Sequence, residues 1–566
     1  MYRQAVSSTR SSESKPKLSL EELASLVSTL QTEVVAIKTE RDTQVSSLQD
    51  TIVNLAHENE ILKRRLFGNK TERLHTSEHQ LALGNLLDDQ KQLQKQLNAA
   101  VAAAKTEADR DEPPPPVKAK TKPKGRRDLS TSDLPQVLLE ILDEDLEKTA
   151  KRVGWDVSRQ LLFRRGGFSV LVKRVAKYEV PGKDGPTVLG VPLPKTLFPR
   201  GLLHSSVVAY ILVQKFGLGV PNYRLEQHIE DLGAPLDRGM MCRYGDEAGG
   251  ALGATVVHAM WQDGISNAAV ISTDATGAMI QPEKRQDGQR QACKKGHFFT
   301  AVVDCDHVLF AYVERHTQEA VLKIFGGFKG FLQCDASNVY DILERGPPKD
   351  EDDGVTLVGC WAHCRRYFFE AAVCKYEVGL QGLLRIRAIY AADNAFKKLP
   401  PAKRKLARNE HVRPLIEAFF DWVRQARLEQ QGRNLATKAL GYAFNQEQEL
   451  RRVLDDGRLP LDNTRAERSL RKIVVGRKNW MFYGSDSHAE SAAAIFSLVA
   501  SCRLHNIDPQ QYLDEVMRVL PYWPATRYLE LAPKYWAATR SNLDPVELDT
   551  WLCPFTVPPA ALNFAR

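Results

Sequence analysis

Two aspartates in the sequence each close a short apolar run. Asp274 closes VISTD and Asp335 closes FLQCD, and both runs have the composition of buried strands. A carboxylate at the end of a buried strand loses hydration unless a partner compensates its charge. Mg²⁺ would be such a partner, since proteins bind it through one or two carboxylates, water and substrate phosphate. Alternatively, each aspartate only ends its strand in a turn, as Asp often does.

A third acid, Glu467, lies in the basic segment LPLDNTRAERSLRKIVVGRKNW (459–480), where a helix is expected. On that helix Asn463, Glu467 and Arg471 follow one another at i, i+4 and i+8 and share a face. One face would then offer an acid for a metal and basic groups for DNA phosphates. The basic residues expected there are Arg468, Arg471, Lys472, Arg477 and Lys478. The alternative is an ordinary Glu–Arg helix pair on a solvated face.

The segments around the two aspartates are rich in strand-forming residues. Strands are expected at 267–274, 297–304, 307–314, 331–335 and 356–363, with a helix around 320–325. Three strands, a helix and two further strands is the order of a ribonuclease-H-like α/β sheet. Residues 371–457 are expected to form a helical insertion. Its apolar stripe consists of Leu415, Ile416, Phe419, Phe420 and Val423.

Residues 20–66 carry a heptad pattern. Apolar side chains fill the a and d positions in two registers that differ by a four-residue stutter, and Asn59 is the polar a residue that would fix register. This predicts a homo-oligomeric coiled coil. The alternative is an intramolecular helical hairpin with the second helical stretch at 79–107.

Two further regions precede the expected core. The stretch VKAKTKPKGRRD (117–128) packs six basic residues into twelve, which favours a polyanion partner or only a solvated linker. Helices on either side of Gly233 predict a helix-turn-helix with Arg238 and Arg243 on its second helix. Plain helix packing is the alternative for that pair.

Composition gives the general class of protein. The 566 residues are 43% hydrophobic and 26% charged, with a net charge of +8, and no apolar run approaches a membrane span. The first residues lack a secretory signal, so a cytoplasmic protein is expected, and the family resemblance described below would make it bacterial and nucleoid-associated. All nine cysteines lie at or beyond Cys242 with irregular spacing. Zinc is therefore not expected, although Cys360, His363 and Cys364 lie close together in the sequence.

One long segment is distinctive enough to compare with a known family. DNTRAERSLRKIVVGRKNWMFYGSDSHAESAAAIFSL (462–498) closely resembles the C-terminal signature of the insertion-sequence sixty-six transposase family, of the TnpC type. Other pieces agree, namely KRRLFGNKTERL (63–74), FPRGLL (198–203), VPNYRLEQ (220–227), CDASNVY (334–340) and CWAHCRRYF (360–368). The resemblance extends from about residue 20 to residue 520.

This resemblance implies a multidomain DDE transposase with an α-helical coiled coil, a helix-turn-helix-like region and a ribonuclease-H-like core interrupted by an all-helical insertion. Its catalytic, metal-binding acids fall on Asp274 of DATG, Asp335 of QCDA and Glu467 of RAERSLR. His363, Arg366 and Asn463 would line the site. The cofactor implied is a pair of Mg²⁺ ions, for which Mn²⁺ could substitute.

The domains expected are a coiled-coil oligomerisation region (1–110), a Pro/Lys-rich linker (111–130), a degenerate zinc-finger-like module (131–195), a helix-turn-helix-like region (196–262), the core (263–370 and 458–525), the helical insertion (371–457) and a C-terminal extension (526–566). Two features depart from the family pattern. Ala275 replaces an acid usually found beside the first Asp, and residues 154–180 keep the flanking pattern of a zinc module without a single Cys.

The partners expected are double-stranded DNA, as transposon terminal inverted repeats and target, and further copies of the chain. The need for accessory transposition proteins stays open. Two other function classes remain. One is a catalytically inactive or domesticated DNA-binding protein, and the other is a ribonuclease-H-like nuclease or Holliday-junction resolvase.

Overall fold

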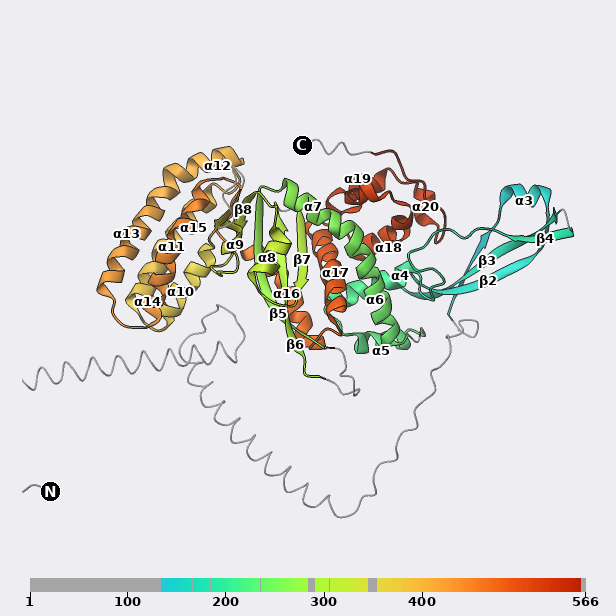
Figure 1. Ribbon diagram of the computed structural model, residues 1–566, viewed down its shortest axis with the longest axis horizontal. Coiled ribbons are helices and arrows are strands. Elements are labelled where there is room, and N and C mark those ends of the chain that lie inside the picture. Colours follow the sequence, from blue (N-terminus) through green and yellow to red (C-terminus); the bar gives the residue numbers. More distant parts are fainter. Residues whose placement is uncertain are drawn as a thin grey trace, which may run out of the picture. The chain divides into compact units, whose positions relative to one another are not determined.

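The computed structural model describes residues 134–164, 166–182, 185–234, 236–282, 291–304, 306–344 and 354–560 (Figure 1). The predicted coiled coil and the linker at 111–130 lie outside these residues. The described chain divides into two compact units. Phe368–Gln381 and Arg433–Ala436 belong to the smaller unit, and all other described residues belong to the larger one.

Four strands form the first sheet of the larger unit. They are β1 (Gln136–Ile141), β2 (Lys151–Arg164), β3 (Gly167–Gly182) and β4 (Gly185–Gly190), with the short helix α3 (Glu144–Thr149) between β1 and β2. The order is β1-β3-β2, with β4 also paired to β3, and β1 is the only strand of these four that runs parallel to its neighbour β3. The segment is rich in Val and Phe, which favour strands. Apolar side chains such as Leu162, Val170 and Ala176 are fully buried in it.

A helical region follows. It consists of α4 (Ser205–Leu212), η2 (Val213–Gly217), α5 (Asn222–Asp231), α6 (Arg238–Leu252), η3 (Gly253–Val257) and α7 (His258–Asn267). Gly233 has a φ of +78° in the turn between α5 and α6, a conformation that suits glycine. The predicted pair of helices around this glycine is therefore present. The second of them, α6, packs against a helix near the C-terminus, α17 (Asp486–Leu504).

The second sheet has five strands in the order β7-β6-β5-β8-β9. They are β5 (Val270–Ile280), β6 (Lys294–Val303), β7 (His307–Val313), β8 (Gly330–Gln333) and β9 (Val355–Val358). Strands β5, β6 and β7 are antiparallel, whereas β8 and β9 run parallel to β5. The helices α8 (Gln318–Phe325) and α9 (Asp341–Glu344) belong to the connections.

Two expected strand ends were wrong. β5 does not end at Asp274 but continues through Ala-Thr-Gly to Ile280, because β6 supplies an antiparallel partner along its whole length. The segment predicted as a strand at 356–363 changes to helix α10 at Trp361. In both places pairing across the sheet, which apolar content does not reveal, sets the end of the strand.

The segment 371–457, expected as a helical insertion, is helical, although its first helix already begins at Trp361. The helices are α10 (Trp361–Val373), α11 (Glu377–Ala395), α12 (Pro401–Ala407), η4 (Arg408–Val412), α13 (Arg413–Glu429), α14 (Leu435–Asn445), α15 (Glu447–Arg451) and η5 (Arg452–Leu454). On α13, the predicted stripe is buried at Ile416, Phe419, Phe420 and Val423, and half-buried at Leu415. A buried ion pair joins Arg408 to Asp393 at 2.6 Å.

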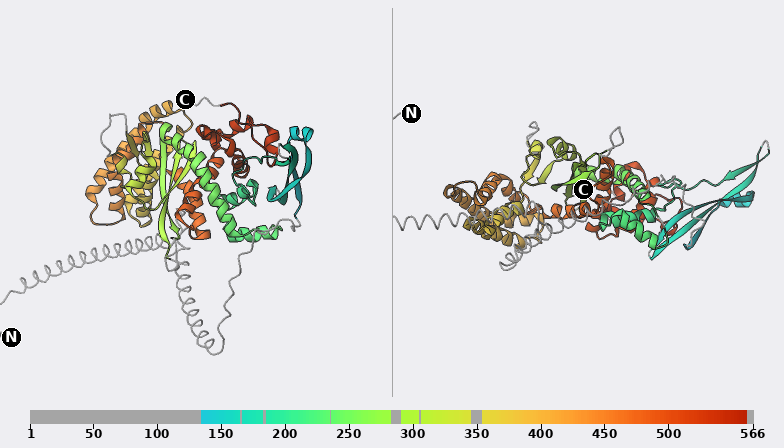
Figure 2. Two further views of the ribbon diagram at one scale, coloured as in Figure 1. Left: turned by 45° about the vertical axis from the view of Figure 1, so that its right-hand side comes forward. Right: turned by 90° about the horizontal axis from the view of Figure 1, so that it is seen from below.

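The C-terminal part is helical and packs on the second sheet. It contains α16 (Thr464–Trp480), α17, α18 (Pro509–Val519), η6 (Leu520–Tyr522), η7 (Ala525–Leu531), α19 (Pro533–Ser541) and α20 (Pro545–Asp549). Helix α16 contacts β5 and β6, and α17 contacts β7 (Figures 1 and 2). The hydroxyls of Ser497 and Ser501 on α17 accept hydrogen bonds from the N–H groups of Phe310 and Val308. These bonds satisfy donors of the edge strand β7 that no further strand pairs.

Candidate active site

Asp274 lies in the middle of the five-stranded sheet, on the strand β5 that pairs with both β6 and β8. Asp274 is half-buried, and its carboxylate accepts a hydrogen bond from the N–H of Ala275 at 2.8 Å. The strand partner directly opposite it on β6 is Thr300. Asp274 is thus an acid placed in a largely apolar strand.

Asp335 follows the neighbouring parallel strand. Ser272 of β5 is paired in register with Gln333 of β8, so each aspartate lies two residues beyond the paired position of its own strand. Because the two strands run parallel in this register, the two aspartates lie at the same level of the sheet, where β8 ends and β5 continues. An Asp335 carboxylate oxygen accepts from the N–H of Ser337 at 3.3 Å.

Glu467 reaches the same region from the first turn of α16. The start of this helix is tied to the sheet because the side-chain amide of Asn463 donates a hydrogen bond to the carbonyl oxygen of Thr273, the residue before Asp274. The backbone carbonyl of Asn463 in turn accepts from the N–H of Glu467 at 3.1 Å. The helix start predicted near residue 463 is therefore correct.

The electrostatics of Asp274 reflect this convergence. The pKa of Asp274 is raised to about 7, chiefly by burial; the hydrogen bond from the N–H of Ala275 opposes this shift, and the negative charges of Asp335 and Glu467 contribute to it. A carboxyl group that is buried beside two other acids carries a charge that its surroundings do not fully compensate. A bound cation would compensate it.

His363 and Arg366, two of the residues expected to line the site, both face Glu467 from helix α10. Nε2 of His363 lies 3.6 Å from Oε1 of Glu467, and a guanidinium nitrogen of Arg366 lies 3.5 Å from the same oxygen. Burial, followed by the charge of Arg366, lowers the pKa of His363. The imidazole is therefore favoured in its neutral form beside the acid.

The expected DNA-contacting residues fall into two groups. Arg477 donates to Thr276 Oγ1 at 3.3 Å and to the Gly277 carbonyl at 2.5 Å, and Lys472 donates to the Gly217 carbonyl at 3.2 Å. These two side chains therefore form hydrogen bonds within the protein. Four of the five expected residues are exposed on α16, namely Arg468, Arg471, Lys472 and Lys478, whereas Arg477 is half-buried.

On α6, Arg243 is exposed, whereas Arg238 lies 3.7 Å from Glu226 in an ion pair. The basic side chains of α16 share their helix with the acid Glu467, while those of α6 lie on a separate element. The α16 group is thus the one that shares an element with an acid of the candidate site.

The group Cys360, His363 and Cys364 contains two thiols, and a thiol binds metals in its deprotonated form. Burial raises the pKa of Cys360 to about 12, and the thiol sulfur accepts a hydrogen bond from the N–H of Asn463 at 3.2 Å. Burial also raises the pKa of Cys364. Both thiols are thus favoured in the protonated form, which is not the form that binds metals.

Within the described ranges, no three His, Cys, Asp or Glu side chains are grouped closely enough to hold a metal ion in this conformation. The donor chemistry at Asp274, Asp335 and Glu467 nevertheless suits a hard divalent cation, which prefers carboxylate oxygens. The raised pKa of Asp274 indicates the same need for positive charge. The residues therefore fit Mg²⁺ by donor type and by charge.

Sequence reasoning missed two buried polar groups. Gln333 is fully buried in β8 and donates to the Pro460 carbonyl at 2.8 Å. The sequence feature that could have revealed it is an amide side chain within an apolar strand. Lys215 is buried beside His488, with 3.2 Å between Nζ and Nε2, and His488 also hydrogen-bonds Asp246. The sequence feature that could have revealed Lys215 is a lysine within the apolar run ILVQKFG. Burial lowers the pKa of Lys215.

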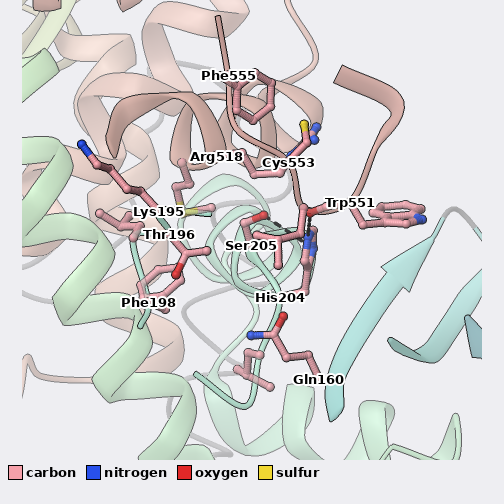
Figure 3. Close-up of a pocket in the computed structure, with 14 residues that line it drawn as sticks. Gln160, Lys195, Thr196, Phe198, His204, Ser205, Arg518, Trp551, Cys553 and Phe555 are labelled. Carbon is pink, nitrogen blue, oxygen red and sulfur yellow. Dashed lines mark hydrogen bonds between the residues drawn. The ribbon is translucent and has the colours of Figure 1, made fainter. Parts of the chain in front are cut away.

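A small cavity of about 40 Å³ lies elsewhere in the larger unit, where the start of α4 meets the C-terminal segment (Figure 3). Its lining includes Gln160, Lys195, His204, Arg518 and Trp551, and none of the three acids. The volume suits a few water molecules rather than a substrate. This cavity is therefore not the candidate active site.

None of the helices within the described ranges is long and apolar enough to cross a membrane.

Comparison with known proteins gives three family matches. The model of the transposase IS66 family matches residues 200–491, just over half of the chain. The IS66 C-terminal element matches residues 497–533, and a model described as the transposase C of IS166 homeodomain matches residues 54–138.

Similar proteins occur in Sinorhizobium fredii (strain NBRC 101917 / NGR234). The uncharacterized protein y4qI is 25% identical over 391 residues, which cover 67% of this chain and 71% of that protein. The uncharacterized protein y4hP is 26% identical over 379 residues, which cover 62% of this chain and 66% of that protein. The first family match includes all three acids and the elements that carry them, from β5 to α16. The chain belongs to the IS66 transposase family.

Proposed function

We propose that this chain is a DDE transposase that cuts DNA at the ends of an insertion sequence and joins those ends to target DNA. Asp274, Asp335 and Glu467 act as the catalytic, metal-binding acids on a ribonuclease-H-like sheet. The observation that carries the proposal is their convergence, since the paired strands β5 and β8 and the first turn of α16 bring all three to one region of one sheet. The mixed strand order, with three antiparallel and two parallel strands, supports the same fold class.

The cofactor proposed is a pair of Mg²⁺ ions, held by the three acids and replaceable by Mn²⁺. When bound, these ions supply charge neutralisation at the reacting phosphodiester and activation of the attacking water or 3′-hydroxyl. The proposal gives no role to zinc, because residues 131–195 contain neither Cys nor His.

The chain's own residues contribute positioning and charge. Arg366 and neutral His363 lie beside Glu467 and restrict its orientation. The exposed residues Arg468, Arg471 and Lys478 on α16 offer charge-assisted hydrogen bonds to phosphates of a DNA strand lying along the helix. Water attack first frees a 3′-hydroxyl at the transposon end, and that hydroxyl then attacks a target phosphodiester, so that no covalent protein–DNA intermediate is needed.

The match to a homeodomain model at residues 54–138 supports DNA as the partner. We further propose that the chain binds terminal inverted repeats and target DNA. It self-associates through the heptads at 20–66 and is located in the cytoplasm. Whether accessory proteins are required is tested by reconstituting the reaction with the purified chain alone.

The test is a strand-transfer assay with DNA from the flanks of the gene, Mg²⁺, and the variants Asp274→Asn, Asp335→Asn and Glu467→Gln. Each variant should lose at least about 1000-fold in cleavage and joining, because each lacks a ligand charge, while DNA binding and thermal unfolding stay near the wild type. Arg465→Gln, a change on the same helix at an exposed position, serves as the matched control.

The rival functions give different products in this assay. Binding without any cleavage by the wild type indicates an inactive or domesticated DNA-binding protein. Cleavage without joining indicates a nuclease or resolvase. Near wild-type strand transfer by any one acid variant removes that residue from the proposed triad.

A further inference from the structure

Three buried polar side chains connect the three segments that carry the acids. Ser272 Oγ donates to Oε1 of Gln333 at 3.1 Å, and Nε2 of Gln333 donates to the carbonyl of Pro460 at 2.8 Å. The amide of Asn463 donates to the carbonyl of Thr273. Ser272 is 6% exposed, and Gln333 and Asn463 are 0% exposed. The bonds close a ring that runs from β5 through β8 and the start of α16 back to β5.

Each member of this ring lies close to one acid along the chain. Ser272 and Gln333 face each other in the parallel register, and each is followed two residues later by an aspartate. Asn463 precedes Glu467 by one helical turn, and its carbonyl accepts the N–H of Glu467. The ring therefore fixes the backbone immediately beside all three carboxylates.

Asn463 occupies the N-cap position of α16 without acting as a helix cap. An N-cap Asn normally accepts a hydrogen bond from an N–H of the first turn. Here the side chain makes no such bond, and its Oδ1 has no hydrogen-bond partner among the described residues. The N–H of Thr464 is instead bonded to Asp462 at 3.1 Å. The side chain of Asn463 thus serves as a cross-link to the sheet.

We infer that Ser272, Gln333 and Asn463 are positioning residues that hold the three proposed metal-binding acids in one arrangement. The inference rests on the proposed function, since it assigns a role toward its metal ligands. Metal ligands must be held to within about 0.5 Å by neighbours that are themselves fixed. Buried hydrogen bonds with little exposure provide such restraint, because breaking one leaves a polar group without a partner.

The test uses neutral substitutions in the full-length protein. Asn463→Ser keeps a residue that favours helix N-termini but is too short to reach Thr273, and Gln333→Met keeps length without a donor. Asn479→Ser is the matched control. Asn479 lies on the same helix and also donates to a backbone carbonyl, that of Gly219 at 2.6 Å, but it is exposed and lies at the opposite end of the helix.

The measurement is binding of Mn²⁺ alone, followed by electron paramagnetic resonance, alongside thermal unfolding. Asn463→Ser and Gln333→Met should each weaken Mn²⁺ binding by about tenfold or more, the usual effect of losing a residue that orients a ligand. Asn479→Ser should stay within about twofold of the wild type. DNA affinity should be unchanged in all three, whereas the turnover number should fall in the first two.

A folded Asn463→Ser protein with wild-type Mn²⁺ affinity would overturn the inference and leave only a structural role. If that variant does not fold, Ser272→Ala decides by the same measurement, because it removes one bond of the ring and leaves the helix start intact. Asp335→Asn separates the two proposals. If this variant and the wild type bind Mn²⁺ equally, the proposed metal site is itself wrong, and the inference falls with it.

Discussion

His204 shows how a single buried residue connects the helical region with the C-terminal segment. Its Nδ1 accepts from the N–H of Ser206, so the ring proton lies on Nε2, which donates to the Trp551 carbonyl at 2.9 Å (Figure 3). Burial lowers the pKa of His204 below its ordinary value of 6.5. The folded protein therefore keeps this imidazole neutral at pH values where an unfolded chain would protonate it.

Stability should consequently fall as the pH drops below about 6.5, because the unfolded state then binds a proton that the folded state does not. The slope from this one group is at most about 1.4 kcal/mol per pH unit. His204→Asn, a neutral residue that can also accept from Ser206, should flatten the fall in the urea midpoint between pH 7.5 and 5.5. His258→Asn, at an exposed position, should keep the wild-type slope. Equal slopes for both variants would refute the assignment.

The acids themselves illustrate what residue types can and cannot reveal. The apolar runs predicted that Asp274 and Asp335 each follow a buried strand, the segment 459–480 predicted a helix for Glu467, and the resemblance assigned all three to one site. The buried ring of Ser272 and Gln333 could not be predicted, because it depends on which residues pair across β5 and β8. Register of parallel strands is a long-range property that local sequence does not encode.

At the scale of elements, the packing of α6 against α17 depends on a close approach of two backbones. A Cβ added at Gly249 would lie 2.6 Å from the carbonyl oxygen of Ser491 and 2.9 Å from its carbonyl carbon. At the adjacent Gly250 a Cβ would meet nothing within 4 Å. The two glycines therefore differ sharply although both lie in the interior of one helix.

Gly249→Ala should lower the free energy of unfolding by about 1–3 kcal/mol, since the helices must separate to admit the methyl group. Gly250→Ala should raise it by up to about 1 kcal/mol, because alanine favours the helix. Thermal unfolding of both variants checks the pair. A Gly249→Ala protein as stable as the wild type would show that α6 and α17 do not pack this closely.

Elements differed in how well sequence predicted them. The helices of the insertion followed from apolar periodicity, and α16 lies within the segment 459–480 where a helix was expected. The end of β5 was not predicted, because Ala275 and Gly277 are poor strand formers and this part of the strand is held by pairing with β6. The same holds for the C-terminal extension, whose helices α19 and α20 showed no motif and form by packing around residues such as Trp536 and Leu548.

At the scale of the whole molecule, the heptads at 20–66 predict self-association of the full chain. These residues lie outside the described ones, and a continuous apolar seam cannot be buried by one helix. Light scattering of the full-length protein at tens of micromolar, roughly the range in which modest coiled coils assemble, should give a mass above that of one chain.

Replacing Leu48, Leu55 and Leu62 at d positions by Glu should reduce that mass to a single chain, because charges would face each other in the seam. Replacing His57 and Arg64, which the same register places on the outer face, by Glu should leave the mass unchanged. A wild-type monomer would favour the alternative, a hairpin with the helical stretch at 79–107.

During translation, Asp274 and Asp335 are synthesised well before Glu467, because the helical insertion lies between Asp335 and Glu467 in the sequence. Domains fold as they emerge, so β5 and β8 can pair while α16 has not yet been made. A translation product that stops anywhere in the insertion contains at most two of the three proposed acids. Unfinished chains would then be unable to cut the chromosome of the cell that makes them.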